Sequence, residues 1–256
     1  MRIISYNVNG IRAAIKKGLI EWLASDPADI ICLQETKAMS TDVNMTEIEA
    51  LGYKSYWFSA QKKGYSGVAI LSKVEPDAVV YGSKIEQSDF EGRVIRASFG
   101  DITIVNAYFP SGTSGDERQT YKYQWLSEFE LYLLELQKTN PKLVITGDYN
   151  IAHTEIDIHD PKGNKKSSGF LPEERDWFTK FLGSGYVDSF RKMNPEAVGA
   201  YSWWSQRFPS VRLQNKGWRI DYICTTANLG DDIKSAYILP DIKHSDHCPI
   251  FLEISK

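Results

Sequence analysis

Short apolar runs recur along the chain, and polar side chains follow many of them at once. Leu143–Thr146 is one such run, and Gly147, Asp148 and Asn150 come directly after it. The run predicts a buried β-strand. Side chains two positions apart in an extended chain point the same way, so Asp148 and Asn150 are expected to converge on one ligand. The alternative is a strand end followed by an Asx-turn.

The same pattern predicts an α/β domain with strands spread over the whole chain. The expected strands are Arg2–Tyr6, Asp29–Leu33, Tyr53–Phe58, Gly67–Ser72, Asp77–Tyr81, Val94–Phe99, Ile102–Ala107, Arg219–Thr225 and Ile250–Ile254. Apolar residues at helical spacing predict helices over Ile11–Trp22, Met45–Leu51, Tyr121–Gln137 and from Leu171 onward. The absence of a linker or tandem repeat predicts one catalytic domain, residues 1–256. The two halves share a similar rhythm, which leaves a diverged duplication open.

Composition limits the class of protein without naming a partner. The chain has 256 residues, of which 42% are hydrophobic, enough for one large core. A net charge of −3 does not announce a nucleic-acid binder, but clustered acids can hide a basic face. Three cysteines in apolar settings predict buried free thiols in a reducing compartment. With no signal-peptide pattern and no apolar run near ~18 residues, we expect a cytoplasmic protein with no membrane partner.

Polar residues that follow strands form a candidate site. Glu35 follows one strand as Asp148 follows another. A surface glutamate is the alternative for Glu35, but a second acid at a strand exit favours a shared metal site at least as strongly. The full set comprises Asn7, Glu35, Tyr108, Asp148, Asn150, Asp221, Asp246 and His247. The set is rich in oxygen ligands, has no cysteine or histidine cluster at zinc spacing, and the chain has no P-loop. Mg²⁺, or alternatively Mn²⁺, suits such ligands.

Metal ligation is expected mainly from acids. Glu35 and Asp246 are the predicted direct ligands, and Asn7 is expected to help through its amide oxygen or a water. The residues expected to face the metal are Glu35, Asn7, Asp246, Asp148, Asn150 and His247. Asp246 and His247 are adjacent, so on an extended chain one could bind metal while the other turns to substrate.

Such a set can hydrolyse a phosphodiester. Asp148 can take a proton from water, and Asn150 can hold that water or a phosphate oxygen. His247, protonated and oriented by Asp221, can donate to a non-bridging oxygen. Tyr108 and the metal can stabilise the leaving oxygen.

Aromatic residues interleaved with cations follow at 201–219 and predict a stacking and phosphate-binding surface. Of the Trp203–Trp204 pair one is expected in the core, whereas Trp218, between Gly217 and Arg219, is expected to be exposed. Basic residues at the start of the first helix, Arg12 among them, indicate phosphate contact or simply a solvated face.

Six segments in order resemble the exonuclease III family of apurinic/apyrimidinic (AP) endonucleases. They are Asn7–Arg12, Leu33–Lys37, Gly64–Val68, Gly147–Asn150, Gly217–Tyr222 and Ser245–Pro249. The resemblance implies a four-layer α/β sandwich of two packed mixed β-sheets flanked by helices. It implies Mg²⁺-dependent incision 5′ to an abasic site, leaving a 3′-hydroxyl and a 5′-deoxyribose phosphate. It further implies 3′-5′ exonuclease and 3′-phosphodiesterase activity, with a monomeric enzyme acting on double-stranded DNA that carries abasic sites or blocked 3′ ends.

The resemblance also implies roles for individual residues. The metal role falls on Glu35, with Asn7 and Asp246 close by. The family's catalytic positions match Tyr108, Asp148, Asn150, Asp221 and His247, and the activation of water is left open among Asp148, Tyr108 and His247. The positions that line the DNA path are Arg12, Lys17, Lys37, Tyr65, Asn164 and Ser167. Trp203 and Trp218 match the pair that walls the pocket for a flipped, baseless sugar.

Three positions depart from the family pattern. Ser111 stands where some relatives have an asparagine, which removes one expected phosphate contact. Asn9 replaces an aspartate of some members and so weakens or alters the expected metal binding. Arg207 stands where some members place an apolar minor-groove wedge, so here a charge would enter the groove.

A different phosphoesterase on the same architecture, such as a sphingomyelinase or an inositol-polyphosphate phosphatase, is one alternative. Those enzymes share the acids but lack the Gly-Trp-Arg-Ile-Asp and Trp-Trp segments.

A non-catalytic DNA-binding protein with a decayed site is the other alternative. Every catalytic position here holds a competent residue type, which argues against decay.

Overall fold

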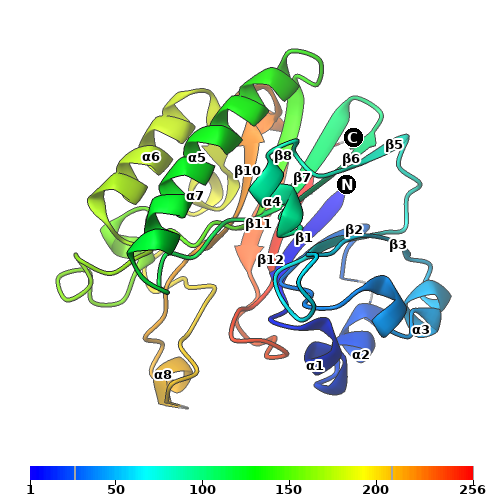
Figure 1. Ribbon diagram of the computed structural model, residues 1–256, viewed down its shortest axis with the longest axis horizontal. Helices are drawn as coiled ribbons and strands as arrows, with labels where there is room; N and C mark the ends of the chain where they lie inside the picture. The colour runs from blue at the N-terminus through cyan, green and yellow to red at the C-terminus, as the bar shows by residue number, and fades with distance from the viewer. Residues whose placement is uncertain (26, 209, 256) are drawn as a thin grey trace.

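Two six-stranded β-sheets pack face to face with helices on both outer faces (Figure 1). The computed structural model describes residues 1–25, 27–208 and 210–255. The first sheet has the strand order β11 (Ile233–Ile238), β12 (Ile250–Ile254), β1 (Arg2–Asn7), β2 (Ile30–Gln34), β4 (Val68–Ser72) and β3 (Lys54–Phe58). The second has the order β5 (Ala78–Tyr81), β6 (Val94–Phe99), β7 (Ile102–Tyr108), β8 (Lys142–Asp148), β10 (Asp221–Thr226) and β9 (Tyr186–Asp188). The predicted four-layer sandwich of mixed sheets is confirmed.

The two sheets repeat one pattern of strand directions. In each sheet the central pair is parallel, β1 with β2 and β7 with β8. All other named pairings are antiparallel in both sheets. The shared layout accounts for the similar rhythm of the two halves of the sequence.

Alternation along the strands builds three separate apolar layers. In β2, Ile30 and Cys32 point into the core between the sheets, whereas Ile31 and Leu33 point outward. The outward side of this sheet is covered by α1 (Ile11–Lys16), α2 (Leu19–Ala24) and α3 (Thr46–Ala50). Each fully buried large side chain contributes about 1.5–3 kcal/mol of transfer free energy. Burial on both faces explains why the strands appear as continuous apolar runs.

On the outer side of the second sheet lie α5 (Asp116–Gln137) and α6 (Pro172–Gly183). The predicted stripe of α5, with Trp125, Phe129 and Leu133, packs onto strand residues such as Ile145. The remaining short elements are α4 (Glu86–Phe90), α7 (Ser189–Met193), α8 (Ser210–Leu213) and the 3₁₀ turns Ser40–Asp42, Glu155–Asp157 and Ala227–Asp232. The cysteines Cys32, Cys224 and Cys248 are free and buried, as predicted. No helix in the described residues is both long and apolar enough to cross a bilayer.

The prediction of one helix over Ile11–Trp22 is wrong. The segment forms α1 and α2, which are separated by Lys17 and Gly18. Gly18 has φ 97°, a left-handed conformation that glycine adopts without steric cost and that ends a right-handed helix. The apolar spacing survives the break because both short helices lie on the same sheet, so periodicity alone could not reveal it.

Strand ends gather at one rim of the sandwich and prepare the site. The carboxyl ends of β7 and β8 are in register, so Tyr108 lies opposite Asp148. Because β10 runs antiparallel to β8, its first residue, Asp221, also lies opposite Asp148. The carboxyl ends of β1 and β2 pair Asn7 with Gln34 in the facing sheet.

Candidate active site

Asp148 is the centre of the polar cluster at this rim. It is buried, and its Oδ2 accepts hydrogen bonds from Asn7 Nδ2 at 2.8 Å and from Asn150 Nδ2 at 3.2 Å. Its Oδ1 accepts from the backbone N–H of Asn150 at 2.9 Å. Asn150 has φ 53°, so the chain turns here and is not extended. Asp148 and Asn150 are joined by the Asx-turn that was the alternative in the sequence, and not by strand alternation.

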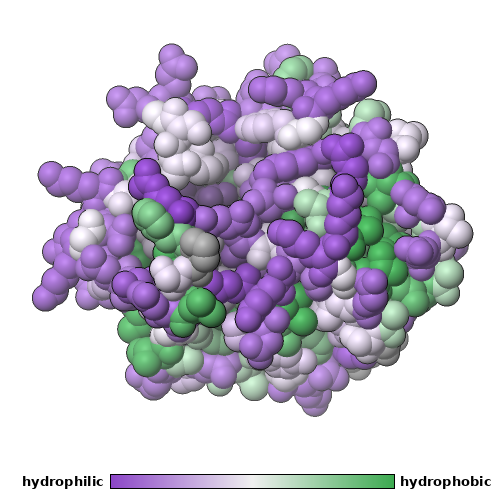
Figure 2. All heavy atoms as spheres, turned by 90° about the horizontal axis from the view of Figure 1, so that it is seen from below, coloured by the Kyte–Doolittle hydropathy of each residue, from purple (hydrophilic) through white to green (hydrophobic). Residues whose placement is uncertain are grey.

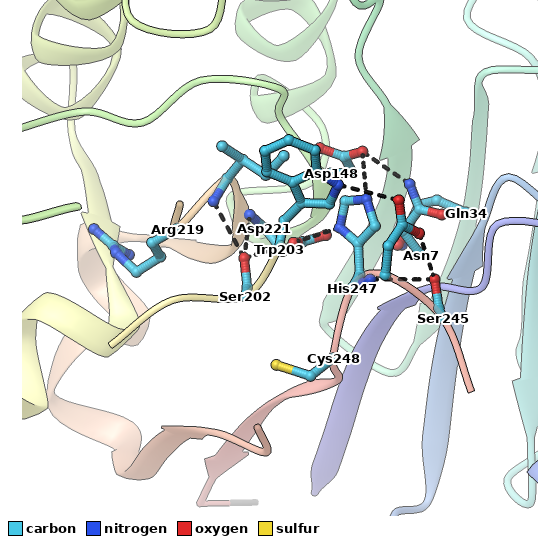
Figure 3. A network of polar contacts seen from close by, with 12 residues as sticks. Asn7, Gln34, Asp148, Ser202, Trp203, Arg219, Asp221, Ser245, His247 and Cys248 are labelled. Carbon is cyan, nitrogen blue, oxygen red and sulfur yellow. Dashed lines mark hydrogen bonds and ion pairs between the residues drawn. The ribbon is translucent and has the colours of Figure 1, made fainter. Parts of the chain in front are cut away.

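His247 links two carboxylates (Figure 3). Its Nδ1 lies 2.8 Å from Asp221 Oδ2, and its Nε2 lies 3.8 Å from Asp148 Oδ2. The hydroxyl of Ser202 donates to the same Asp221 oxygen at 2.6 Å. The expected pairing of Asp221 with the imidazole is present, and the carboxylate selects the orientation and charge of the ring.

Burial and neighbouring charges together raise the pKa values of both Asp148 and His247. Burial, followed by repulsion from Asp221 and Glu35, raises the pKa of Asp148. Burial alone would lower the pKa of His247, but the attraction of Asp221 and Asp148 outweighs it and raises that pKa. At neutral pH the imidazole therefore carries a proton, and Asp148 is a stronger base than an ordinary aspartate.

One side-chain atom each of Glu35, Asp148 and His247 lies within 4.8 Å of the other two. Because the imidazole carries a proton, the two carboxylates are the candidate metal ligands. Glu35 Oε1 accepts from Asn7 Nδ2 at 2.9 Å, and Glu35 Oε2 lies 2.7 Å from Lys37 Nζ. Burial opposes ionisation of Glu35, but Lys37 and Asn7 outweigh it and lower its pKa. Two carboxylates held this close repel each other, and a divalent cation between them would relieve that repulsion. The donor set thus fits a hard cation.

Asp246 and Asn7 face the site in ways the sequence did not predict. Asp246 lines the pocket, but its oxygens accept from Asn9 Nδ2 at 2.9 Å and from Trp203 Nε1 at 3.1 Å. Asn7 directs its amide nitrogen at Glu35 and Asp148, while its oxygen accepts from the backbone N–H of Asn9 at 2.9 Å. Asn7 therefore braces the two acids through hydrogen bonds, whereas Asp246 is held by Asn9 and Trp203.

Tyr108 presents its phenol to the acids from the end of β7. Burial, followed by the negative charges of Glu35 and Asp148, raises its pKa well above the ordinary value. The Arg93 guanidinium lies 4.9 Å from the centre of the Tyr108 ring and donates to the Tyr108 carbonyl at 2.8 Å. The phenol therefore stays protonated and can act as a donor.

A pocket opens over these groups, and two tryptophans form one side of it. Trp203 and Trp218 meet edge to face with ring centres 5.9 Å apart, and both line the pocket. Trp204 is the buried member of the Trp-Trp pair, and Trp218 is half-buried. The pocket is lined further by Glu35, Tyr108, Ser111, Asp148, Asn150, Ser167, Asp246 and His247.

The DNA-path candidates lie in several places around the rim. Arg12 and Lys37 line a smaller hollow together with Lys16, and Ser167 lines the main pocket. Asn164 accepts a hydrogen bond from Ser167 Oγ at 3.1 Å.

Asn164 and three other candidates lie outside both hollows. Tyr65 is half-buried, Lys17 is exposed beside His244, and Arg207 is exposed on the loop before α8. Viewed from this side, the surface is mainly hydrophilic (Figure 2).

Sequence reasoning missed a set of buried ions that support the site. Glu91 accepts from Arg93 Nε at 2.6 Å and from Arg118 Nη1 at 2.9 Å, and both guanidiniums donate to the Tyr65 hydroxyl. Asp157 similarly accepts from Arg219 Nε at 2.7 Å. Partners so far apart in the chain leave no local pattern. A charged residue next to apolar strand residues, as Arg93 is next to β6, was the one available signal.

Comparisons with known proteins agree with this geometry. Residues 4–247 match the endonuclease/exonuclease/phosphatase family. The chain is 45% identical over 256 residues to an exodeoxyribonuclease of Bacillus subtilis (strain 168), covering 100% of both proteins. It is 42% identical over 254 residues to the DNA repair nuclease APEX1 of Danio rerio, covering 98% of this chain and 81% of that protein. The solved structure of an AP endonuclease from Archaeoglobus fulgidus resembles it with a TM-score of 0.89 at 33% identity, covering 100% of both chains. The chain therefore belongs to the endonuclease/exonuclease/phosphatase family and, within it, to the exonuclease III group of AP endonucleases.

Proposed function

We propose that this chain is a metal-dependent DNA-repair nuclease that hydrolyses the phosphodiester 5′ to an abasic site. The products are a 3′-hydroxyl and a 5′-deoxyribose phosphate. The observation that supports this most directly is that the acids and His247 line the same pocket as the Trp203–Trp218 pair. A baseless sugar is the nucleotide fragment that can turn out of a duplex at the lowest cost, because no base must be unstacked.

Asp148 is the proposed general base. Its raised pKa brings it closer to neutrality, where a base that accepts a proton from water is most effective. Asn150, whose amide already contacts Asp148, holds the water or a phosphate oxygen beside it.

His247 is the proposed donor to the phosphate. As a cation oriented by Asp221, it stabilises the negative charge that builds on a non-bridging oxygen. Tyr108, protonated at neutral pH, donates to the leaving 3′-oxygen. Each group acts on a different oxygen of one phosphate.

Mg²⁺ is the proposed cofactor, with Mn²⁺ as a substitute. Glu35 and Asp148 would hold it, with Asp246, Asn7 and His247 close by. When bound, the ion supplies a positive charge that neutralises the phosphate and favours departure of the leaving oxygen. The hard oxygen donors favour Mg²⁺ over softer metals.

The proposed substrate is double-stranded DNA with abasic sites or blocked 3′ ends, cut by a monomer. The phosphate backbone of the DNA is contacted around the rim by Arg12, Lys37, Tyr65 and Ser167. We further propose 3′-5′ exonuclease and 3′-phosphodiesterase activity and a cytoplasmic location, the latter supported by three free buried thiols.

A panel of end-labelled duplexes tests the function. The purified protein is incubated with abasic, 3′-blocked, uracil-containing and intact duplexes, with Mg²⁺ or with a chelator. We expect the abasic strand to be cleaved on the 5′ side of the abasic site with Mg²⁺ and to stay intact with the chelator. Cleavage of inositol phosphates with no cut in the abasic duplex would refute the proposal.

A further inference from the structure

A fully buried ion pair joins α5 to α6. These two helices run side by side (Figure 1). Lys122 of α5 and Glu174 of the first turn of α6 are both 0% exposed, with Nζ and Oε1 2.5 Å apart. Burying two charges costs several kcal/mol before they attract each other, and apolar replacements of such pairs are often no less stable. Stability alone is therefore a weak reason for this pair.

The cationic side of the pair holds Asn150. Lys122 Nζ donates to the Asn150 carbonyl at 2.7 Å. With φ 53°, Asn150 is in the left-handed region, which costs an ordinary residue about 1–2 kcal/mol. Its side chain is tied to Phe109 O at 3.1 Å and its N–H to Asp148. The Lys122 bond holds the Asn150 carbonyl, so both main-chain polar groups of this residue are fixed and its backbone is anchored where the side-chain amide meets Asp148.

The anionic side holds the opposite wall of the pocket. Glu174 Oε2 accepts from the N–H groups of Gly169 at 2.6 Å and of Leu171 at 3.0 Å. Gly169 has φ +94°, and it lies between two parts of the pocket. A Cβ at this position would lie 3.0 Å from the Trp218 ring and 3.1 Å from the Asn150 carbonyl. Glu174 therefore sets how closely the Trp218 wall and the Asn150 turn approach each other.

We propose that Lys122 and Glu174 form a positioning pair that sets the distance between the catalytic edge at Asn150 and the sugar-binding wall at Trp218. The inference rests on the proposed function. Neither side chain is among the residues that line the pocket, so both act through Asn150 and Gly169. A displacement of about 1 Å at a catalytic group can cost about 100-fold in rate, which is the scale at which such a pair matters.

The double variant Lys122→Met/Glu174→Gln removes the hydrogen bond to Asn150 and keeps those to Gly169 and Leu171. The glutamine that replaces Glu174 can still accept from the Gly169 and Leu171 amides. The methionine that replaces Lys122 fills the volume, but the Asn150 carbonyl loses its donor. On an abasic duplex we expect kcat to fall by about 10–100-fold. KM should change by less than about threefold, because the wall at Gly169 stays attached.

Leu133→Ala is the matched control, since Leu133 lies buried on the same helix and packs in the core away from the pocket. It lowers stability without touching Asn150, so its kcat should equal that of the parent at a temperature where all variants are folded. Equal kcat for the double variant and the parent, or an equal loss in Leu133→Ala, would overturn the inference. A parent protein that leaves the abasic duplex uncut would instead overturn the proposed function.

Two single variants serve if the double variant does not fold. Lys122→Gln keeps a donor for Glu174 but is too short to reach the Asn150 carbonyl, so kcat should fall. Lys122→Arg supplies donors to both partners and should restore kcat to within about threefold of the parent. A Lys122→Arg enzyme that is folded and as slow as Lys122→Gln would show that packing, and not the hydrogen bond, is what matters.

Discussion

Asp148→Asn is the sharpest test of the catalytic cluster. The substitution keeps the shape of the side chain and removes its charge and its basicity. Removing a general base costs about 10²–10⁴-fold in kcat. In free energy this corresponds to about 3–5 kcal/mol of lost transition-state stabilisation.

The hydrogen bonds of Asp148 add a stability cost of their own. One oxygen accepts from two side-chain amides and the other from a backbone N–H, so either orientation of an asparagine places its NH₂ against a donor. A buried donor without an acceptor costs about 1–3 kcal/mol. For a domain of this size, each kcal/mol lowers Tm by about 2–4 °C.

The assay separates these two effects. Single-turnover cleavage of an end-labelled abasic duplex gives the chemical rate well below Tm, and fluorescence anisotropy gives the affinity for the same duplex. We expect the rate to collapse while affinity for abasic DNA is retained. Asp101→Asn, an exposed acid at the far end of β7, is the control and should cleave at the parent rate. A variant Asp148→Asn that cleaves within tenfold of the parent would refute the assignment of Asp148 as the general base, whereas a parent that binds the abasic duplex without cutting it would favour a pure binding module.

Three further substitutions test other parts of the structure. Glu35→Ala should raise the Mg²⁺ concentration needed for half-maximal activity by on the order of tenfold or more, whereas an unchanged metal titration would exclude Glu35 as a ligand. Trp218→Ala should lower the preference for abasic over intact duplex by about tenfold, or about 1.4 kcal/mol, and equal preference would remove Trp218 from the pocket. Burial would raise the pKa of Glu91, but Arg118 and Arg93 outweigh it and lower that pKa to about 2. Because the folded-state pKa is depressed from 4.5, Glu91 stabilises the fold above pH 4.5 and loses this contribution as pH falls toward 2. Thermal melts of Glu91→Gln should therefore show a shallower loss of Tm over that range than the parent, and parallel curves would contradict the ion-pair assignment.

The local sequence predicted the strands and the polar side chains that follow them at the rim. A run such as Leu143–Thr146 cannot be exposed, so it predicts a buried strand wherever it is placed. The polar residues that follow such runs were expected at strand ends, and β-strand register brings Tyr108, Asp148 and Asp221 together. Distant motifs in family order added the two-sheet architecture, which no single run could specify.

Tertiary structure decided what depends on partners far apart in the chain. At Asn150 the local sequence left two conformations open, and the fold selected the turn. The hydrogen bonds that occupy Asp246 join residues far apart in the chain, and no local pattern encodes them. The same holds for Lys122 and Glu174, which are 52 residues apart and look like surface charges in sequence. Sequence determined which groups could do chemistry, because their types and strand positions are local properties. Only the fold determined their distances, charges and supports, because these arise where two sheets and two helices meet.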